Sequence, residues 1–217
     1  MSGRLKARSK ELELLDVETP PPRELARVAA FHAFVNTWLG GTNAVVRRLK
    51  EMRGVATVLD VGAGAADIPL ALARRFPEVR PIAMDLSNGL LSFARGLPRV
   101  RGDGRRLPFR NGSVDVVIST HLFHHLADDE IILALREFDR VARHGIIVND
   151  LLRSRRAVLW IRLFSLWANR YTRFDGPLSV KRGFTVPEVD ALARRAGLYW
   201  LWTRVHFGHR FTLAGER

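Results

Sequence analysis

Short apolar runs and amphipathic segments alternate along most of the chain. Runs rich in valine and isoleucine predict strands, and the segments between them carry apolar residues at helical spacing. The expected strands cover residues 56–61, 79–84, a short stretch near Val100, 114–119, 145–149, 198–206 and 209–215. The expected helices of this region cover 67–75, 87–95, 128–142 and 185–197. This order predicts an α/β fold with a doubly wound, mostly parallel, Rossmann-like sheet of seven strands.

Two segments depart from this rhythm. Residues 1–53 contain two helical patterns, 23–39 and 43–52, which we interpret as an N-terminal helical cap. The glycines at 40–41 between them would let the backbone approach closely. Residues 151–178 contain a long amphipathic pattern, which we interpret as one lid helix inserted into a domain that spans 54–217. Its expected aromatic face comprises Trp160, Phe164, Trp167 and Tyr171.

Composition narrows the class of protein. The 217 residues are 47% hydrophobic and 26% charged, without cysteine, which is typical of a globular protein and excludes disulfides and thiolate catalysis. The N-terminus lacks the apolar core of a secretion signal, so we expect a cytoplasmic protein. The net charge of +13 comes mostly from arginines spread over nearly every segment. We interpret them as a solvated surface, with contact to an anionic membrane surface left open.

Acidic residues follow three successive predicted strands. Asp60 ends the first, Asp85 ends the second, and Asp103 comes after the third. Because the carboxyl ends of parallel strands meet at one edge of a sheet, we expect these side chains to line one crevice. Asp60 and Asp67 flank the glycine loop at 62–64, where they would repel a bare phosphate. The pattern therefore favours a cofactor that has no phosphate and carries a cationic centre.

Five motifs in order carry a resemblance to a known family. They are VLDVGAGAAD at 58–67, AMDLS at 83–87, RGDGRRLPF at 101–109, SVDVVISTHLFHHL at 113–126 and LREFDRVARHGIIVND at 135–150. Over residues 55–150 the chain resembles the class I S-adenosylmethionine-dependent methyltransferases, of the small-molecule type with methyltransferase domain 11 or 25. It departs from the usual pattern at Ala66, where the family has a third glycine, and in the turn at 143–145.

The resemblance implies S-adenosylmethionine as the cofactor. Asp85 would accept hydrogen bonds from both ribose hydroxyls, and Asp103 from the adenine amino group. The Gly104 amide and Leu86 would adjoin the adenine, and the tip of the fourth strand would adjoin the methionine portion. The complete set of implied cofactor residues is Asp60, Gly62, Ala63, Gly64, Asp85, Leu86, Asp103, Gly104, Ser119, Thr120 and His121.

Methyl transfer to a hydroxyl needs a base where the acceptor still carries its proton. His121 is the first candidate because it lies nearest the strand tip, although a role in cofactor contact is equally open to it. His124 and Asp150 are further catalytic candidates, against packing around the next helix and a strand-end turn. Candidate acceptor contacts are Arg153, Trp160 and Phe164, against a solvated arginine and ordinary core packing.

These residues predict transfer of a methyl group to a small, largely apolar, hydroxylated acceptor, such as an aromatic, polyketide-like or quinone-precursor molecule. O-methylation is favoured and C-methylation is the near alternative. We expect no metal site. Methylation of RNA and a non-catalytic, cofactor-binding partner subunit are the competing interpretations. The exit of the fourth strand lacks the Pro-Pro-aromatic loop that stacks a nucleic-acid base in amino-nitrogen methyltransferases, so we expect no nucleic-acid partner.

Overall fold

A computed structural model describes residue 5 and residues 7–217. Residues 1–4 and 6, which belong to the start of the predicted N-terminal cap, lie outside the described residues. The described chain forms a seven-stranded sheet with the strand order β3-β2-β1-β4-β5-β7-β6. Strands β1 to β5 are parallel, and β7 runs antiparallel to both β5 and β6. The predicted fold class is confirmed. The strands are β1 Thr57–Val61, β2 Arg80–Asp85, β3 Arg99–Arg101, β4 Val114–Thr120, β5 Ala142–Leu151, β6 Trp202–His206 and β7 Arg210–Glu216.

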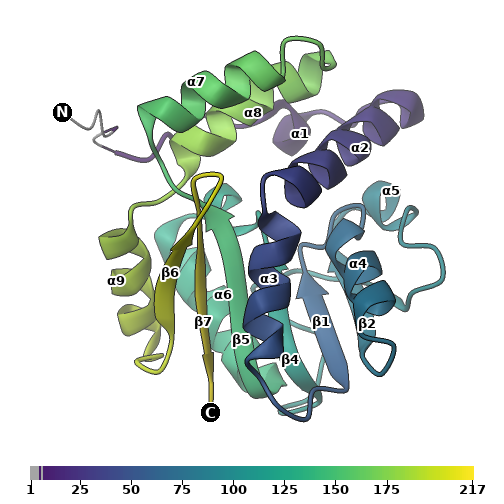
Figure 1. Ribbon diagram of the computed structural model, residues 1–217, viewed down its shortest axis with the longest axis vertical. Helices are drawn as coiled ribbons and strands as arrows, with labels where there is room; N and C mark the ends of the chain where they lie inside the picture. Colours follow the sequence, from purple (N-terminus) through teal and green to yellow (C-terminus); the bar gives the residue numbers. More distant parts are fainter. Residues whose placement is uncertain (1–4, 6) are drawn as a thin grey trace.

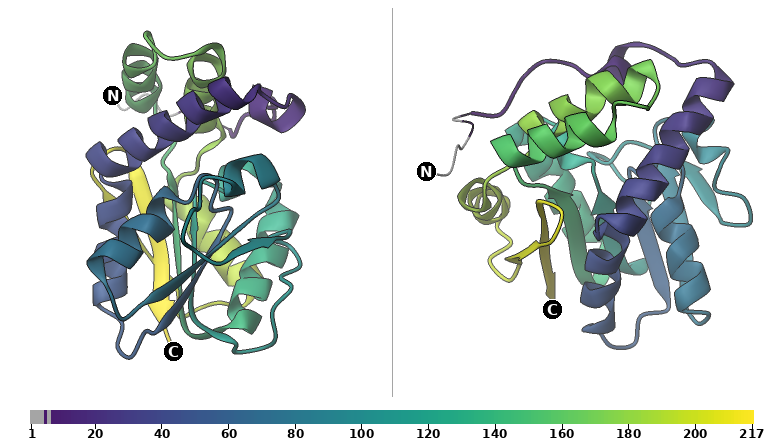
Figure 2. Two further views of the ribbon diagram at one scale, coloured as in Figure 1. Left: turned by 90° about the vertical axis from the view of Figure 1, so that its right-hand side faces the viewer. Right: turned by 45° about the horizontal axis from the view of Figure 1, so that its top comes forward.

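Helices cover both faces of the sheet, as the continuous apolar strands require (Figures 1 and 2). One face carries α3 Gly41–Lys50, α4 Asp67–Arg75 and the short α5 Asn88–Leu91, and the other carries α6 Asp128–Val141 and α9 Val186–Ala196. Every residue of β4 is buried, because this central strand is covered on both sides and hydrogen-bonded to β1 and β5.

Four further helices lie across the carboxyl ends of the parallel strands (Figure 1). They are α1 Leu14–Val17, α2 Pro22–Trp38, α7 Arg155–Phe164 and α8 Arg170–Arg182. Helix α8 packs beside α7 and contacts α1, α2 and the single 3₁₀ turn η1 Phe123–His125. Within the described residues, no helix combines the length and the apolarity that a membrane crossing requires. Because α1, α2, α7 and α8 lie across the strand ends, these helices form the surroundings of the predicted crevice.

Two sequence expectations about helices are wrong. The helix expected over 87–95 is only the single turn α5. The single lid helix is instead a pair, because the Asn169 side chain accepts a hydrogen bond from the Thr172 amide (3.0 Å) and begins α8 there. Trp167 lies in the turn between α7 and α8 and is 96% exposed, whereas Tyr171 is buried on α8. The two side chains therefore do not share one aromatic face with Trp160.

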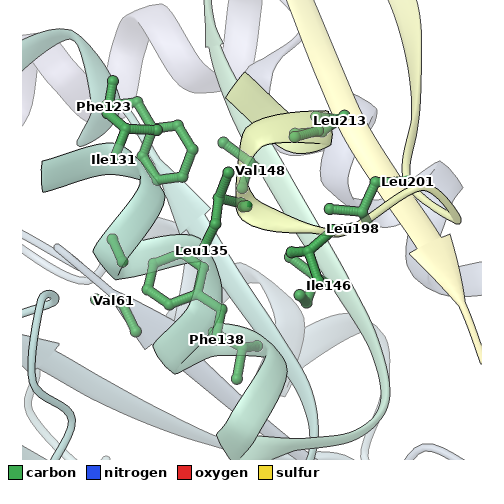
Figure 3. Close-up of a cluster of buried hydrophobic side chains, with 14 of the residues drawn as sticks. Val61, Phe123, Ile131, Leu135, Phe138, Ile146, Val148, Leu198, Leu201 and Leu213 are labelled. Carbon is green, nitrogen blue, oxygen red and sulfur yellow. The ribbon is translucent and has the colours of Figure 1, made fainter. Parts of the chain in front are cut away.

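The largest apolar cluster lies between the sheet and the face formed by α6 and α9 (Figure 3). Phe138 of α6 is fully buried in it, and its ring lies 6.0 Å from the ring of Phe123 in η1. Val61 and Val148 contribute from β1 and β5, close to the carboxyl ends of these strands. This packing fixes η1, and with it the turn that follows β4, against the body of the domain.

We expect Phe138→Ala to lower the free energy of unfolding by about 3–5 kcal/mol, because it leaves a cavity in a closely packed core. Leu133→Ala on the same helix is the matched control, since Leu133 is exposed and its truncation is expected to cost about 0.5 kcal/mol or less. Urea unfolding followed by circular dichroism measures both values. Equal losses for the two variants would contradict this assignment of the core.

Candidate active site

The carboxyl ends of β1, β2 and β4 surround a cavity of about 240 Å³, here termed the glycine-loop cavity. It lies at the edge of the sheet where the predicted acids were expected to meet. Of the predicted cofactor residues, it is lined by Gly62, Asp85, Leu86, Asp103 and Gly104. Sequence reasoning missed its other lining residues, which are Gly102, Arg105, Leu122, His125, Leu126 and Glu130.

Asp85 is fixed at the tip of β2 by two backbone amides. Its Oδ2 accepts from the Gly64 amide and its Oδ1 from the Ser87 amide, both at 2.8 Å. The first bond ties the end of β2 to the glycine loop after β1. Since each carboxylate oxygen can accept more than one hydrogen bond, the group still has lone pairs for a ligand in the cavity.

Asp60 is buried beneath the glycine loop, and among the described residues its Oδ1 has no hydrogen-bond partner. Burial, together with the neighbouring charges of Asp67 and Asp85, raises the pKa of Asp60 well above its usual range. A buried carboxylate in this surrounding is stabilised by a positive charge close by. The strand tips therefore favour a cationic ligand group, as the sequence argument expected.

Gly62 allows the loop to pass close to the turn after β4. Its φ of 74° is left-handed, and a Cβ at this position would lie 3.1 Å from the Leu122 side chain. A larger residue would be strained and would push Leu122 into the cavity that both residues line. The glycine is therefore required by the backbone conformation and by the close contact together.

The predicted cofactor residues Ala63, Ser119 and Thr120 do not line the glycine-loop cavity. Ser119 is buried and donates to the Val61 carbonyl (2.8 Å), so it joins β4 to β1. Thr120 is buried at the end of β4, and its Oγ1 has no partner among the described residues. Asp103 does line the cavity, but both of its carboxylate oxygens already accept from Arg105. Ala63 is buried within the loop.

A second, larger cavity of about 560 Å³, here termed the apolar cavity, lies under α2, α7 and α8. Trp160 and Phe164, both predicted as acceptor contacts, line it from α7. His121 lines the apolar cavity, while the next residue, Leu122, lines the glycine-loop cavity. Two adjacent residues after β4 therefore separate the two spaces. The other lining residues are Phe31, His32, Val35, Leu39, Leu151, Leu152, Ala157, Ile161, Gly176, Ser179, Val180 and the turn 205–210.

Arg210, at the start of β7, brings a buried charge to the apolar cavity. It is 1% exposed, its Nη1 contacts Nε2 of His121, and its Nε has no partner among the described residues. Burial lowers the pKa of Arg210 to about 10, so the guanidinium remains charged at neutral pH. Burial and the neighbouring Arg210 charge hold the pKa of His121 well below its usual range. The imidazole is therefore neutral and its Nε2 accepts from Arg210.

Gly41 makes room for this arginine. A Cβ on Gly41 would lie 2.4 Å from Oδ1 of Asn36 and 3.0 Å from Nη1 of Arg210. The close backbone approach expected at residues 40–41 thus occurs, and it is directed at Asn36 and Arg210. Asn36 in turn donates to Asp67 at 3.0 Å, which links α2 to the helix after the glycine loop.

His124 and Asp150, both predicted as catalytic, form a buried pair behind the cavities. Asp150 accepts from Nδ1 of His124 (2.7 Å) and from the Phe123 and Leu151 amides (2.9 and 2.7 Å). Burial by itself would raise the pKa of Asp150, but the hydrogen bonds from His124 and the Leu151 amide, with the nearby imidazole of His121, hold it well below its usual range. Neither side chain lines either cavity. This arrangement supports the alternative in which the pair fixes the turn after β4.

Arg153 also lies away from both cavities. It is 4% exposed, and its guanidinium binds Glu188 (2.8 Å) and the Gly183 carbonyl (2.7 Å). The expectation that Arg153 orients an acceptor is therefore not supported, and neither is the alternative of a solvated arginine. The charged residue at the apolar cavity is Arg210, which the sequence analysis placed in a closing strand without a role. The feature of the sequence that could have indicated Arg210 is a charged residue directly before the apolar run FTLA and close to two histidines.

Comparison with known proteins agrees with this geometry. The sequence profile of the family described as "Methyltransferase domain" matches residues 58–145, which run from β1 into β5. A crystal structure of a SAM-dependent methyltransferase from Aquifex aeolicus superposes with a TM-score of 0.64 at 17% identity, covering 91% of this chain and 99% of that one. Residues 58–145 therefore match a methyltransferase domain, and the chain has the fold of the class I S-adenosylmethionine-dependent methyltransferases.

Curated relatives match only part of this chain. A malonyl-[acyl-carrier protein] O-methyltransferase of Geobacter sulfurreducens is 38% identical over 78 residues, which are 33% of this chain and 29% of that protein. A demethylmenaquinone methyltransferase of Mycolicibacterium vanbaalenii is 38% identical over 90 residues, 41% of this chain and 38% of that protein. The matches cover less than two-fifths of either relative.

We expect Asp150→Asn to lower the free energy of unfolding by about 3–5 kcal/mol, because it leaves the His124 imidazole and three backbone amides facing a neutral amide. Asp129→Asn is the matched control: Asp129 forms an exposed ion pair with Arg195, and its loss is expected to cost at most about 1 kcal/mol. Urea unfolding at neutral pH measures both. A fully stable but inactive Asp150→Asn variant would instead restore the catalytic interpretation.

Proposed function

We propose that the protein transfers a methyl group from S-adenosylmethionine to an acidic oxygen of a small, largely apolar molecule. The observation that carries the proposal is the pair of cavities divided by His121 and Leu122, one lined by the family's cofactor motifs and the other apolar with a buried guanidinium. Two partial relatives are named malonyl-[acyl-carrier protein] O-methyltransferase and demethylmenaquinone methyltransferase, and these names support methyl transfer to an acceptor other than nucleic acid.

The residues at the strand tips fit S-adenosylmethionine. Asp85 is held by two amides in a position to accept from ribose hydroxyls, and Gly104 and Leu86 line the same cavity. The buried carboxylate of Asp60, whose Oδ1 has no hydrogen-bond partner in the described part of the chain, suits the cationic amino-acid end of the cofactor. When bound, the cofactor supplies a methyl group on a positively charged sulfur. The chain's part is to hold both reactants in line and to exclude water.

The apolar cavity suits the acceptor. Its volume is in the range of small-molecule sites, and its walls from α2, α7 and the β6–β7 turn are mainly aliphatic and aromatic. Trp160 and Phe164 stack at 6.1 Å between ring centroids and remain half-exposed, so an apolar ring or chain would cover them. Burial of that surface would supply much of the binding free energy.

Arg210 gives the cavity its chemical preference. A guanidinium in an apolar surrounding strongly stabilises an anionic oxygen, so a phenol or carboxylic acid would bind there as its conjugate base. In this arrangement His121 orients Arg210 by accepting from it, and an acidic acceptor loses its proton to solvent before transfer. The oxygen–methyl bond then forms as the sulfur–methyl bond breaks. The products are a methyl ether or ester and S-adenosylhomocysteine.

The direct test uses methyl-labelled S-adenosylmethionine with the purified protein and a cell extract, followed by separation of the small organic, RNA and protein fractions. The proposal expects label in the organic fraction, on an oxygen, with no transfer by Asp85→Ala. Alkaline treatment distinguishes an ester, which releases methanol, from an ether. Label in RNA alone would contradict the acceptor class. Cofactor binding without transfer to any fraction would favour a partner subunit.

We expect Asp85→Ala to weaken S-adenosylmethionine binding at least about a hundredfold, because two hydrogen bonds to a charged acceptor are lost. Isothermal titration calorimetry measures the change. Asp129→Ala, on the exposed surface of α6, serves as the control and should bind with unchanged affinity. An unchanged affinity for a folded Asp85→Ala variant would count against its place in the cofactor site.

We expect Arg210→Lys to lower kcat/KM for an acidic acceptor about a hundredfold, since lysine cannot match the planar donor geometry of the guanidinium. Cofactor affinity, measured separately, should stay unchanged. His121→Gln keeps an acceptor for Arg210 but cannot take up a proton, so it should retain activity within about tenfold if His121 only orients Arg210. A loss of about a hundredfold or more in His121→Gln would identify His121 as the base.

A further inference from the structure

Three metal-ligating side chains converge beside the glycine-loop cavity, where the N-terminal segment crosses η1. Glu13 precedes α1, and His124 and His125 form the end of η1. One Glu13 oxygen lies 3.8 Å from Nε2 of His124, and the other lies 3.8 Å from Nε2 of His125. One ligand atom from each of the three residues lies within 4.8 Å of the others. Glu13 is more than a hundred positions from the two adjacent histidines in the sequence, so only the fold brings it to them.

The two imidazole rings are oriented by carboxylates on their opposite sides. Nδ1 of His124 contacts Asp150 at 2.7 Å, and Nδ1 of His125 contacts Asp16 at 3.0 Å. A carboxylate at Nδ1 makes that nitrogen the proton donor and leaves the lone pair on Nε2. Metal-binding histidines are held in the same way, by a carboxylate on the nitrogen that does not bind the ion. Both Nε2 lone pairs are therefore directed toward the same carboxylate.

The backbone of the turn is fixed as well. Arg182 of α8 donates to the His124 carbonyl at 2.8 Å and to the His125 carbonyl at 2.9 Å. The same guanidinium binds Asp16 at 2.7 Å. On the other side, Ser179 of α8 donates to Glu13 at 2.8 Å. Each ligand is thus held by a second residue, which is the support that a preorganised metal site requires.

Three hydrogen-bond acceptors facing one another repel unless a cation lies between them. Glu13 is 3% exposed and His124 is 2% exposed, so water screens this repulsion poorly. We propose that Glu13, His124 and His125 bind a divalent transition-metal ion, for which Zn²⁺ fits the donor set of two imidazoles and one carboxylate. Ligand atoms at ordinary bond lengths of about 2.0–2.2 Å from a tetrahedral ion lie about 3.4 Å apart, so each Glu13–imidazole distance of 3.8 Å would have to close by about 0.4 Å.

Such an ion would fasten the N-terminal segment to the wall of the glycine-loop cavity. His125 lines that cavity, and the segment before α1 connects through α1 to α2, which lines the apolar cavity. The ion would therefore hold the helices over the strand ends in the arrangement described here. It has no part in the methyl-transfer chemistry proposed above, so the two proposals can fail separately.

The test uses tag-free protein, stripped of metal with a chelator and titrated with Zn²⁺ by calorimetry. The expected result is one ion per chain, slower tryptic cleavage after the exposed Lys10, and a higher thermal midpoint. Co²⁺ in place of Zn²⁺ should give the visible absorption bands of imidazole-bound cobalt. Absence of a stoichiometric ion in the wild-type protein would overturn the proposal and leave the cluster as a buried, proton-mediated contact.

His125→Ala is the informative variant, because its side chain is 29% exposed and its loss spares the buried His124–Asp150 pair. We expect it to weaken Zn²⁺ binding at least about tenfold and to abolish the zinc-dependent protection of Lys10. His144→Ala, which removes a half-exposed imidazole beside Asp115, is the matched control and should bind Zn²⁺ as the wild type does. Equal weakening in both variants, or in neither, would contradict this ligand set.

Discussion

The buried carboxylate of Asp150 fixes the turn on which the rest of the site depends. It joins the end of β5 to the backbone of η1 and to His124, and therefore sets where β4 ends and in which direction the chain leaves the sheet. Because this turn contains His121 and Leu122 in succession, one set of hydrogen bonds positions the partition between the two cavities. The hydrogen-bonded residues Asp150, Phe123 and His124 line neither cavity, yet the positions of both cavities depend on them.

Charge at the strand ends is divided between two environments. The acids Asp60 and Asp85 surround the glycine loop, where a cation is stabilised, whereas Arg210 lies at the apolar cavity, where an anion is stabilised. The turn at His121 and Leu122 lies between the glycine-loop cavity and the apolar cavity. A positively charged methyl donor and a negatively charged acceptor would each find the opposite charge on its own side, and this complementarity supports transfer to an acidic oxygen.

The N-terminal segment contributes residues to the site, as the sheet does. Helix α2 supplies Phe31 and Val35 to the apolar cavity, and Glu13 reaches the histidines of η1 from the segment before α1. Most of the excess arginine is accounted for by exposed positions, but Arg182 and Arg210 are buried and organise the helices over the strand ends. Net charge alone could not separate these two arginines from the others.

By itself, the sequence determined the order of the sheet elements, the fold class and the acids and glycines of the β1–β2 region. These signals are local. The strands are short apolar runs rich in valine and isoleucine, and Asp60, Gly62 and Asp85 belong to motifs only a few residues long. The tertiary structure alone decided the break at Asn169, the inward placement of Arg153 against Glu188, and the meetings of Arg210 with His121 and of Glu13 with His124. Each of these pairs joins segments distant in the chain, and their energies depend on burial and mutual orientation, which no local pattern encodes.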